Sequence, residues 1–181
     1  MGALRMLDAL GWLNRQCAVL GVRIASVLVA LMSVIVILGV FFRYVLNDSL
    51  TWVEDVSLIM MVTTAFVIAP YAYRTGANVA IEVFIAVLPD KALRVLRIVI
   101  NMLILWIVYR YFFESLSMVH RGWGIRINTV ALPWAYPYMV LPVTFVVMAL
   151  VAIELIGRDL WALVMGSTKA DLPHIAPIEP E

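Results

Sequence analysis

Charged side chains are scarce in this chain. Only 14% of its 181 residues are Asp, Glu, Lys or Arg, whereas an average soluble protein has about a quarter. The formal net charge is +1, so the concentrated basic face that nucleic-acid binding requires is missing. The single cysteine, Cys17, excludes an intramolecular disulfide. The two histidines, His120 and His174, lie outside the apolar runs, which excludes a bis-histidine haem inside a helix bundle.

Catalytic motifs are also missing. The sequence has no Walker-type phosphate loop, and no set of Ser, His and Asp is placed to meet near one plane. The centres of its apolar runs contain no carboxylate, although a small proton-coupled exporter needs one there. We therefore predict that the chain is not an enzyme and has no catalytic residue, cofactor or metal site of its own.

Long apolar runs dominate what is present. Hydrophobic residues make up 65% of the chain, and a water-soluble fold of this size cannot bury that much apolar surface. Four runs are long enough to span a bilayer, and we expect helices because a backbone in lipid must satisfy its own hydrogen bonds. The sequence predicts an all-α integral membrane protein whose region 24–165 holds four transmembrane helices, at about 24–42, 56–73, 92–113 and 130–156.

Two further segments are predicted to lie along the membrane surface. Residues 1–23 have apolar side chains at i, i+3 and i+4 with charged residues on the other side, which favours an amphipathic interfacial helix. Residues 78–88 are apolar but too short to span, so we expect a second short interfacial helix there. The tail 166–181 has three prolines and few apolar anchors, and we expect it to be disordered.

The distribution of Lys and Arg predicts the orientation. Nine of them lie in the N-terminal segment, the second connection and the tail, whereas four lie in the first and third connections. Because positive residues are concentrated on the cytoplasmic side, we expect both termini in the cytoplasm. The connection between the first two spans then faces outward.

Polar residues within the spans are few and have structural interpretations. Thr63, Thr64 and Asn101 are predicted to bond their own helix or a neighbouring one. Small side chains that permit close helix packing line one face of the first span, at Ser26, Ala30 and Ser33.

Two pairs at i, i+4 spacing place opposite charges near predicted helix ends. They are Arg110 with Glu114 and Glu154 with Arg158. In this interpretation Arg110 lies in the last turns of the third span, from which its charge can reach the headgroups. Both pairs are interpreted as boundary salt bridges rather than as proton relays.

The stretch RYVLNDSLTWVEDV, residues 43–56, gathers charges between the first two spans. Arg43 suits the negative end of a helix dipole, and Thr51 with Glu54 has the spacing of a capping box. We therefore interpret Arg43 and Thr51 as helix-boundary residues before any metal or catalytic role. The start of the fourth span is predicted to be irregular, or to form a groove for another subunit, because prolines crowd it at Pro133, Pro137 and Pro142.

The order of these blocks resembles a known family. FRYVLNDSLTWVEDVSLIMM, residues 42–61, is similar to the signature of the small permease subunit of TRAP (tripartite ATP-independent periplasmic) transporters, the DctQ-like family. The segments 73–89 and 128–148 resemble the next block of that family and the start of its last helix. The family often has an acidic residue or His where Ala77 and Asn78 stand, so this chain is less charged there.

The resemblance implies a scaffold subunit in the bacterial inner membrane, part of a sodium-coupled secondary transporter that imports organic acids such as carboxylates. The implied partners are a large membrane subunit with the substrate and sodium sites, a periplasmic solute-binding protein and membrane lipids. Candidates for docking the binding protein lie at the expected outer end: Asp48, Trp52, Glu54, Asp55, Arg121 and Arg126. The alternative is a membrane anchor or assembly subunit of another multi-subunit membrane enzyme, which a redox-active partner would indicate.

Overall fold

The chain is mostly helical. The computed structural model describes residues 2–85, 90–130 and 132–165. Its helices there are α1 (Gly2–Tyr44), α2 (Trp52–Ile85), α3 (Asp90–Gly122), α4 (Ala135–Tyr138) and α5 (Val140–Met165). Four helical segments, within α1, α2, α3 and α4–α5, are long and apolar enough to cross a membrane. The predicted all-α membrane class with four spans is therefore confirmed.

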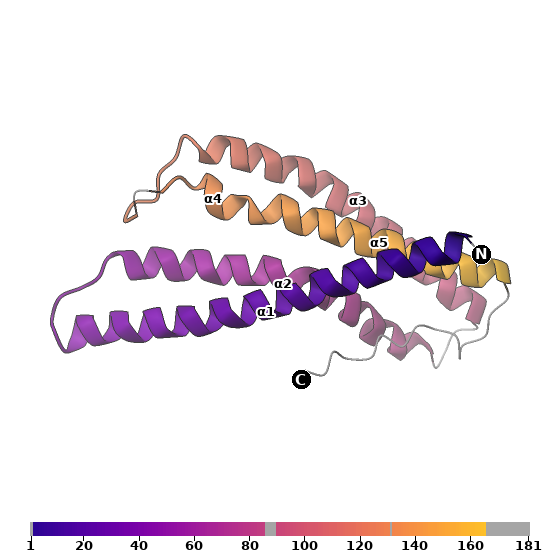
Figure 1. The fold of residues 1–181 in the computed structure, drawn as a ribbon, viewed down its shortest axis with the longest axis horizontal. Coiled ribbons are helices and arrows are strands. Elements are labelled where there is room, and N and C mark those ends of the chain that lie inside the picture. Colours follow the sequence, from indigo (N-terminus) through magenta and orange to yellow (C-terminus); the bar gives the residue numbers. More distant parts are fainter. Residues whose placement is uncertain (1, 86–89, 131, 166–181) are drawn as a thin grey trace.

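The long helices form two antiparallel hairpins (Figure 1). α1 and α2 make one hairpin, closed by the connection 45–51, and α3 and α5 make the other, closed by the connection 123–134. Both connections lie at the same end of the molecule, and the N-terminal half of α1 crosses α5 near the opposite end. Because α5 contacts every other helix, polar groups on α5 can bond across both hairpins.

α1 is one continuous helix, whereas the sequence pattern predicts an interfacial helix at 1–23 followed by a span at 24–42. Its 43 residues extend for about 64 Å, roughly twice the thickness of a hydrocarbon core. The helix continues across residue 23 because its buried residues form one stripe on both sides of that point: Gly11, Asn14, Ala18, Gly21 and Ala25. The interfacial position of 1–23 is not confirmed and stays a prediction.

Other helix ends also differ from the predicted spans. α3 continues to Gly122, beyond the predicted end at 113, and residues 130–134 precede α4. α2 continues to Ile85, so the predicted short helix at 78–88 begins within α2 and ends outside the described residues, as does the tail 166–181. An apolar run marks only the part of a helix that lipid can cover, and the helix continues until a turn or proline ends it.

Glycine brings α1 and α2 together. A Cβ atom on Gly21 would lie 2.7 Å from the carbonyl oxygen of Val67, so a larger residue would push the helices apart. The close packing predicted for Ser26, Ala30 and Ser33 is wrong within this chain, because all three are exposed. The hydroxyls of the two serines donate instead to carbonyl oxygens one turn earlier in α1.

Pro70 lies within α2 and leaves one backbone carbonyl without its helical donor. Because proline has no N–H, the carbonyl of Phe66, four residues earlier, loses its usual partner. The hydroxyl of Thr144 on α5 donates to this oxygen at 3.1 Å. The missing hydrogen bond is therefore replaced from the other hairpin, which ties α2 to α5.

Two of the polar residues within the spans bond as predicted. The hydroxyl of Thr64 donates to the carbonyl oxygen of Met60 in its own helix at 2.8 Å. Asn101 is buried on α3, and its side-chain oxygen accepts a hydrogen bond from the hydroxyl of Tyr73 on α2 at 2.6 Å. The structural interpretation of Thr64 and Asn101 is confirmed.

The chain reaches α5 through an irregular segment rich in proline. Pro133 forms an isolated bridge with Arg126, and Pro137 lies in the short helix α4. Pro142 lies in the first turn of α5, where a backbone N–H has no helical partner to lose. The irregular start of the last span is confirmed, and its role as a groove for another subunit stays a prediction.

Candidate functional site

The connection between α1 and α2 holds the first group of charged residues. The guanidinium of Arg43 lies 3.7 Å from the carboxylate of Glu54, which links the last turn of α1 to the first turn of α2. Asn47 has a positive φ of 55°, a conformation that asparagine adopts more readily than most residues. Thr51 directly precedes α2, so Arg43 and Thr51 both stand at helix boundaries.

Asp55, in the first turn of α2, joins the first hairpin to the second. Its carboxylate accepts a hydrogen bond from the hydroxyl of Thr129 at 2.6 Å. Because Thr129 lies in the connection 123–134 and Asp55 in the first turn of α2, the bond ties that connection to the start of α2. Both lie at the end of the molecule where the hairpins are closed (Figure 1). The other residues predicted to dock a binding protein share this end and are exposed: Asp48, Trp52, Glu54, Arg121 and Arg126. Their docking role stays a prediction.

A hollow of about 310 Å³ lies between the facing ends of α1 and α2. Val36 and Val53 line it together with the Arg43–Glu54 ion pair. The hydroxyl oxygen of Ser57, which also lines it, is buried and has no hydrogen-bond partner in the described part of the chain. Charged, polar and apolar groups therefore adjoin here, as they do at protein–protein interfaces.

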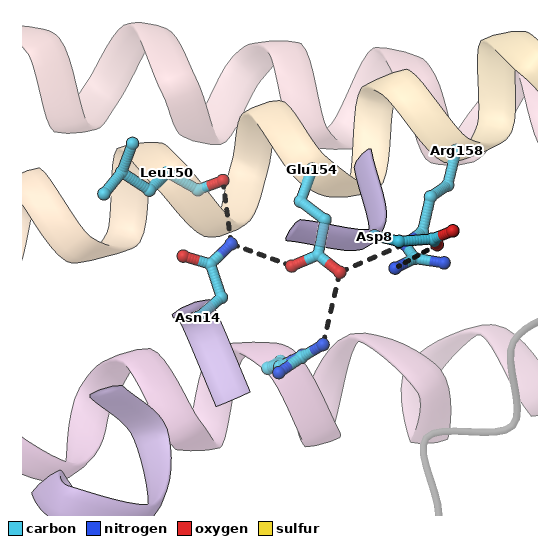
Figure 2. Close-up of polar contacts among 6 residues, drawn as sticks. Asp8, Asn14, Leu150, Glu154 and Arg158 are labelled. Atoms are coloured by element: carbon cyan, nitrogen blue, oxygen red, sulfur yellow. Dashed lines mark hydrogen bonds and ion pairs between the residues drawn. The ribbon is translucent and has the colours of Figure 1, made fainter. Parts of the chain in front are cut away.

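A second polar group is buried where α1 crosses α5 (Figure 2). Glu154 on α5 is only 1% exposed. Its Oε2 accepts a hydrogen bond from the side-chain amide of Asn14 on α1 at 2.8 Å, and that amide also donates to the carbonyl of Leu150. Its Oε1 accepts hydrogen bonds from Arg74 on α2 at 3.2 Å and from Arg158 on α5 at 3.0 Å. We call Asn14, Arg74, Glu154 and Arg158 the Glu154 cluster.

The charges of the Glu154 cluster are compensated locally. Two guanidinium groups face Glu154, and Arg158 also lies 3.7 Å from the carboxylate of Asp8 on α1. Gly11 leaves room for these groups, because a Cβ atom there would lie 2.6 Å from Oε1 of Glu154. Donors from α1, α2 and α5 hold one carboxylate in place. The cluster therefore has a structural role, because it links three helices.

A further ion pair joins α3 to α5. The guanidinium of Arg97 lies 3.9 Å from the carboxylate of Asp159, and both residues are buried. α5 thus carries two buried carboxylates: Glu154 bonds to the first hairpin, and Asp159 pairs with α3. Polar contacts of α5 therefore join the first hairpin to the second and also stabilise the second hairpin itself.

Comparison with models of known families shows where this arrangement belongs. Residues 32–161, well over half of the chain, match the family described as "Tripartite ATP-independent periplasmic transporters, DctQ component". The chain belongs to the DctQ family. No protein with a curated description matches it.

The DctQ match includes the features on which the resemblance rests. It contains the block 42–61 and three members of the Glu154 cluster, whereas Asn14 lies before it. The DctQ family is a transporter component and not an enzyme family. With its four apolar helices the chain is a multi-pass membrane protein. Membership in a tripartite transporter implies a large membrane subunit and a binding protein as partners.

Sequence reasoning identifies only half of the Glu154 cluster. The predicted ion pair of Glu154 with Arg158 is confirmed at 3.0 Å. Its predicted place at a helix boundary is wrong for Glu154, because α5 continues for eleven residues beyond this buried carboxylate. Asn14 and Arg74 are missed, because the first lies in a segment interpreted as interfacial and the second in one interpreted as a loop. The available signal is that Asn14 is the one strongly polar residue in the stripe of small residues that α1 buries.

The predicted position of Arg110 is wrong. Because α3 continues to Gly122, Arg110 lies 12 residues, or about 18 Å, before the end of the helix instead of in its last turns. The ion pair predicted between Arg110 and Glu114 does not occur among the described residues, and both side chains are exposed.

Proposed function

We propose that this DctQ chain is the non-transporting scaffold subunit of a sodium-coupled TRAP transporter that imports organic acids such as carboxylates. The subunit lies in the bacterial inner membrane with both termini in the cytoplasm. It stabilises the large membrane subunit, which holds the solute and sodium sites, and it helps to dock the periplasmic binding protein. The observation that supports this proposal most is the family match over residues 32–161.

The Glu154 cluster is consistent with a scaffold. A carrier site must bind and release its ligand, so its polar groups have to be available to that ligand. The carboxylate of Glu154 is instead occupied on both oxygens by Asn14, Arg74 and Arg158. These contacts hold α1 and α2 against α5. A scaffold needs such a fixed arrangement of helices, because its partner moves against it during transport.

The outer end is the proposed docking surface for the binding protein. It presents exposed residues of both charge signs, and the Thr129–Asp55 hydrogen bond ties the connection 123–134 to the start of α2. Complementary charges across an interface mainly raise the rate of association, which falls with salt. We expect charge reversal at Asp48 or Arg126 to slow binding of the binding protein and to change its salt dependence. Reversal of Arg15, an exposed charge near the other end of α1, is the control.

Solute uptake by reconstituted components tests whether the DctQ chain itself transports. The organic acid is first chosen as the one that raises the melting temperature of the binding protein. Its uptake into proteoliposomes under a sodium gradient is then measured with the DctQ chain, the large subunit and the binding protein together, and with each left out. We expect uptake only from the complete set. Uptake by the DctQ chain alone would contradict the proposal.

A further inference from the structure

A polar stripe runs along the outward face of α3. Its members recur at i, i+4, i+7 and i+11, so they lie on one side of the helix. Arg110 follows the buried Asn101 by nine residues, which is about two and a half turns and therefore the opposite face. All members of the stripe are exposed: Arg110, Glu114, Ser117 and Arg121.

Ring contacts fix the height of Arg110 along the helices. The neighbouring Tyr111 stacks on Phe145 of α5 with centroids 6.1 Å apart, and Phe145 lies 6.2 Å from the ring of Phe66 on α2. Phe66 is 14 residues, or about 21 Å, from the start of α2. Phe145 is nine residues, or about 14 Å, from Glu154. Arg110 is also about 18 Å from the end of α3, so it lies inside the segment Arg94–Gly122 that is long and apolar enough to cross a membrane.

A cation at this depth needs a partner. Neither Arg110 nor Glu114 has an ion pair within the described ranges 2–85, 90–130 and 132–165. An arginine directed at lipid is strongly unfavourable, and intramembrane charges nearly always face protein or water and pair. One arginine can extend toward the headgroups. Lipid tails, however, offer neither a counter-charge nor a hydrogen-bond partner to a stripe that has both charge signs over three turns.

An apolar groove adjoins the polar stripe. A hollow of about 600 Å³ lies between α3 and α5, and Trp106, one turn below Arg110, lines it. Its other lining residues are apolar or aromatic, among them Met102, Phe112 and Phe145. The polar stripe of α3 thus lies next to an apolar groove between α3 and α5. Another helix can pack on such a surface, because its apolar side chains fit into the groove.

We propose that the polar stripe and this groove bind a transmembrane helix of the large TRAP subunit that presents a carboxylate to Arg110 and a hydrogen-bond donor to Glu114. This proposal rests on the proposed function, because it names the face through which the scaffold holds its partner. The apolar side chains of that helix fill the groove beside Trp106.

Co-purification tests the polar stripe. The full DctQ chain is tagged and co-expressed with the large subunit, and the amount of large subunit retained is measured for the Arg110→Leu, Glu114→Leu double variant. We expect a loss of about tenfold or more, because truncated charge pairs at interfaces have effects of at least that size. Arg23→Leu removes an arginine on α1 that is also exposed and likewise forms no ion pair among the described residues, and we expect no loss.

The outcomes separate this inference from the proposed function. If the unmodified chain retains the large subunit and the double variant retains as much, the polar stripe is not the contact face and the inference is wrong. If the unmodified chain retains no large subunit, the proposed function fails and the inference fails with it. Loss in the double variant with retention in Arg23→Leu supports the inference.

Photo-crosslinking gives a second readout that does not depend on disrupting the stripe. A photoreactive amino acid replaces Leu103 or Phe113, both exposed beside the stripe on α3, and Leu31 on α1 is the control. We expect the two α3 positions to crosslink to the large subunit within the assembled complex, and the α1 position to do so much less. Crosslinks only to lipid, or to a second copy of this chain, would overturn the proposal.

Discussion

Replacing Glu154 with glutamine should destabilise the folded chain strongly. Gln keeps the shape of the side chain but removes the negative charge that two guanidinium groups face. Glu154 accepts on both oxygens, from Asn14 on one and from the two arginines on the other, whereas Gln has only one acceptor oxygen. In either orientation its NH2 group therefore takes the place of an acceptor. Removing one partner of a buried ion pair costs about 3–5 kcal/mol, and single hydrogen bonds between membrane helices contribute about 0.6 kcal/mol. The charge term dominates, so we expect a loss of about 3 kcal/mol.

Equilibrium unfolding in mixed micelles, followed by helical circular dichroism, measures this loss. Glu54→Gln is the matched control, because the Glu54 side chain is 85% exposed in its ion pair with Arg43 and such pairs contribute about 0–1 kcal/mol. Arg74→Gln combined with Glu154→Gln should lose less than the sum of the single changes, by about 1 kcal/mol or more. A loss for Glu154→Gln no larger than for Glu54→Gln would refute the reasoning.

Two further predictions concern the contacts of α2. Thr144→Val should lower the free energy of unfolding by about 1 kcal/mol, because it leaves the carbonyl of Phe66 without a donor; adding Pro70→Ala should recover part of this loss by restoring the helical N–H. Equal effects of Thr144→Val with and without Pro70→Ala in the same unfolding assay would contradict the explanation. Gly21→Ala should cost about 1–3 kcal/mol, because its Cβ would lie 2.7 Å from a backbone oxygen of Val67; a variant as stable as the unmodified chain would show that the helices separate without cost.

The number of spanning helices and the boundary at 43–56 could be predicted from the sequence, because both depend on local patterns. A run of apolar residues long enough to span a bilayer is visible without any tertiary contact. Thr64 is a similar case, since its hydroxyl bonds its own helix. Such features require only the spacing of neighbouring residues.

The complete Glu154 cluster could not be predicted, because Asn14 and Arg74 are far from Glu154 along the chain. Asn14 and Glu154 are separated by 140 positions, and the i, i+4 pattern indicates only the bond to Arg158. The position of the polar stripe along α3 could not be predicted for a different reason. An apolar run indicates where lipid can cover a helix but not where that helix ends, so the height of Arg110 depends on ring contacts with α5.

The most direct test of the scaffold proposal is the mass of the complex purified from native membranes through a tag on this chain. Native mass spectrometry in detergent should show the DctQ chain with one large polytopic membrane subunit. A chain that is isolated alone, or together with a haem- or flavin-containing enzyme, would contradict the account.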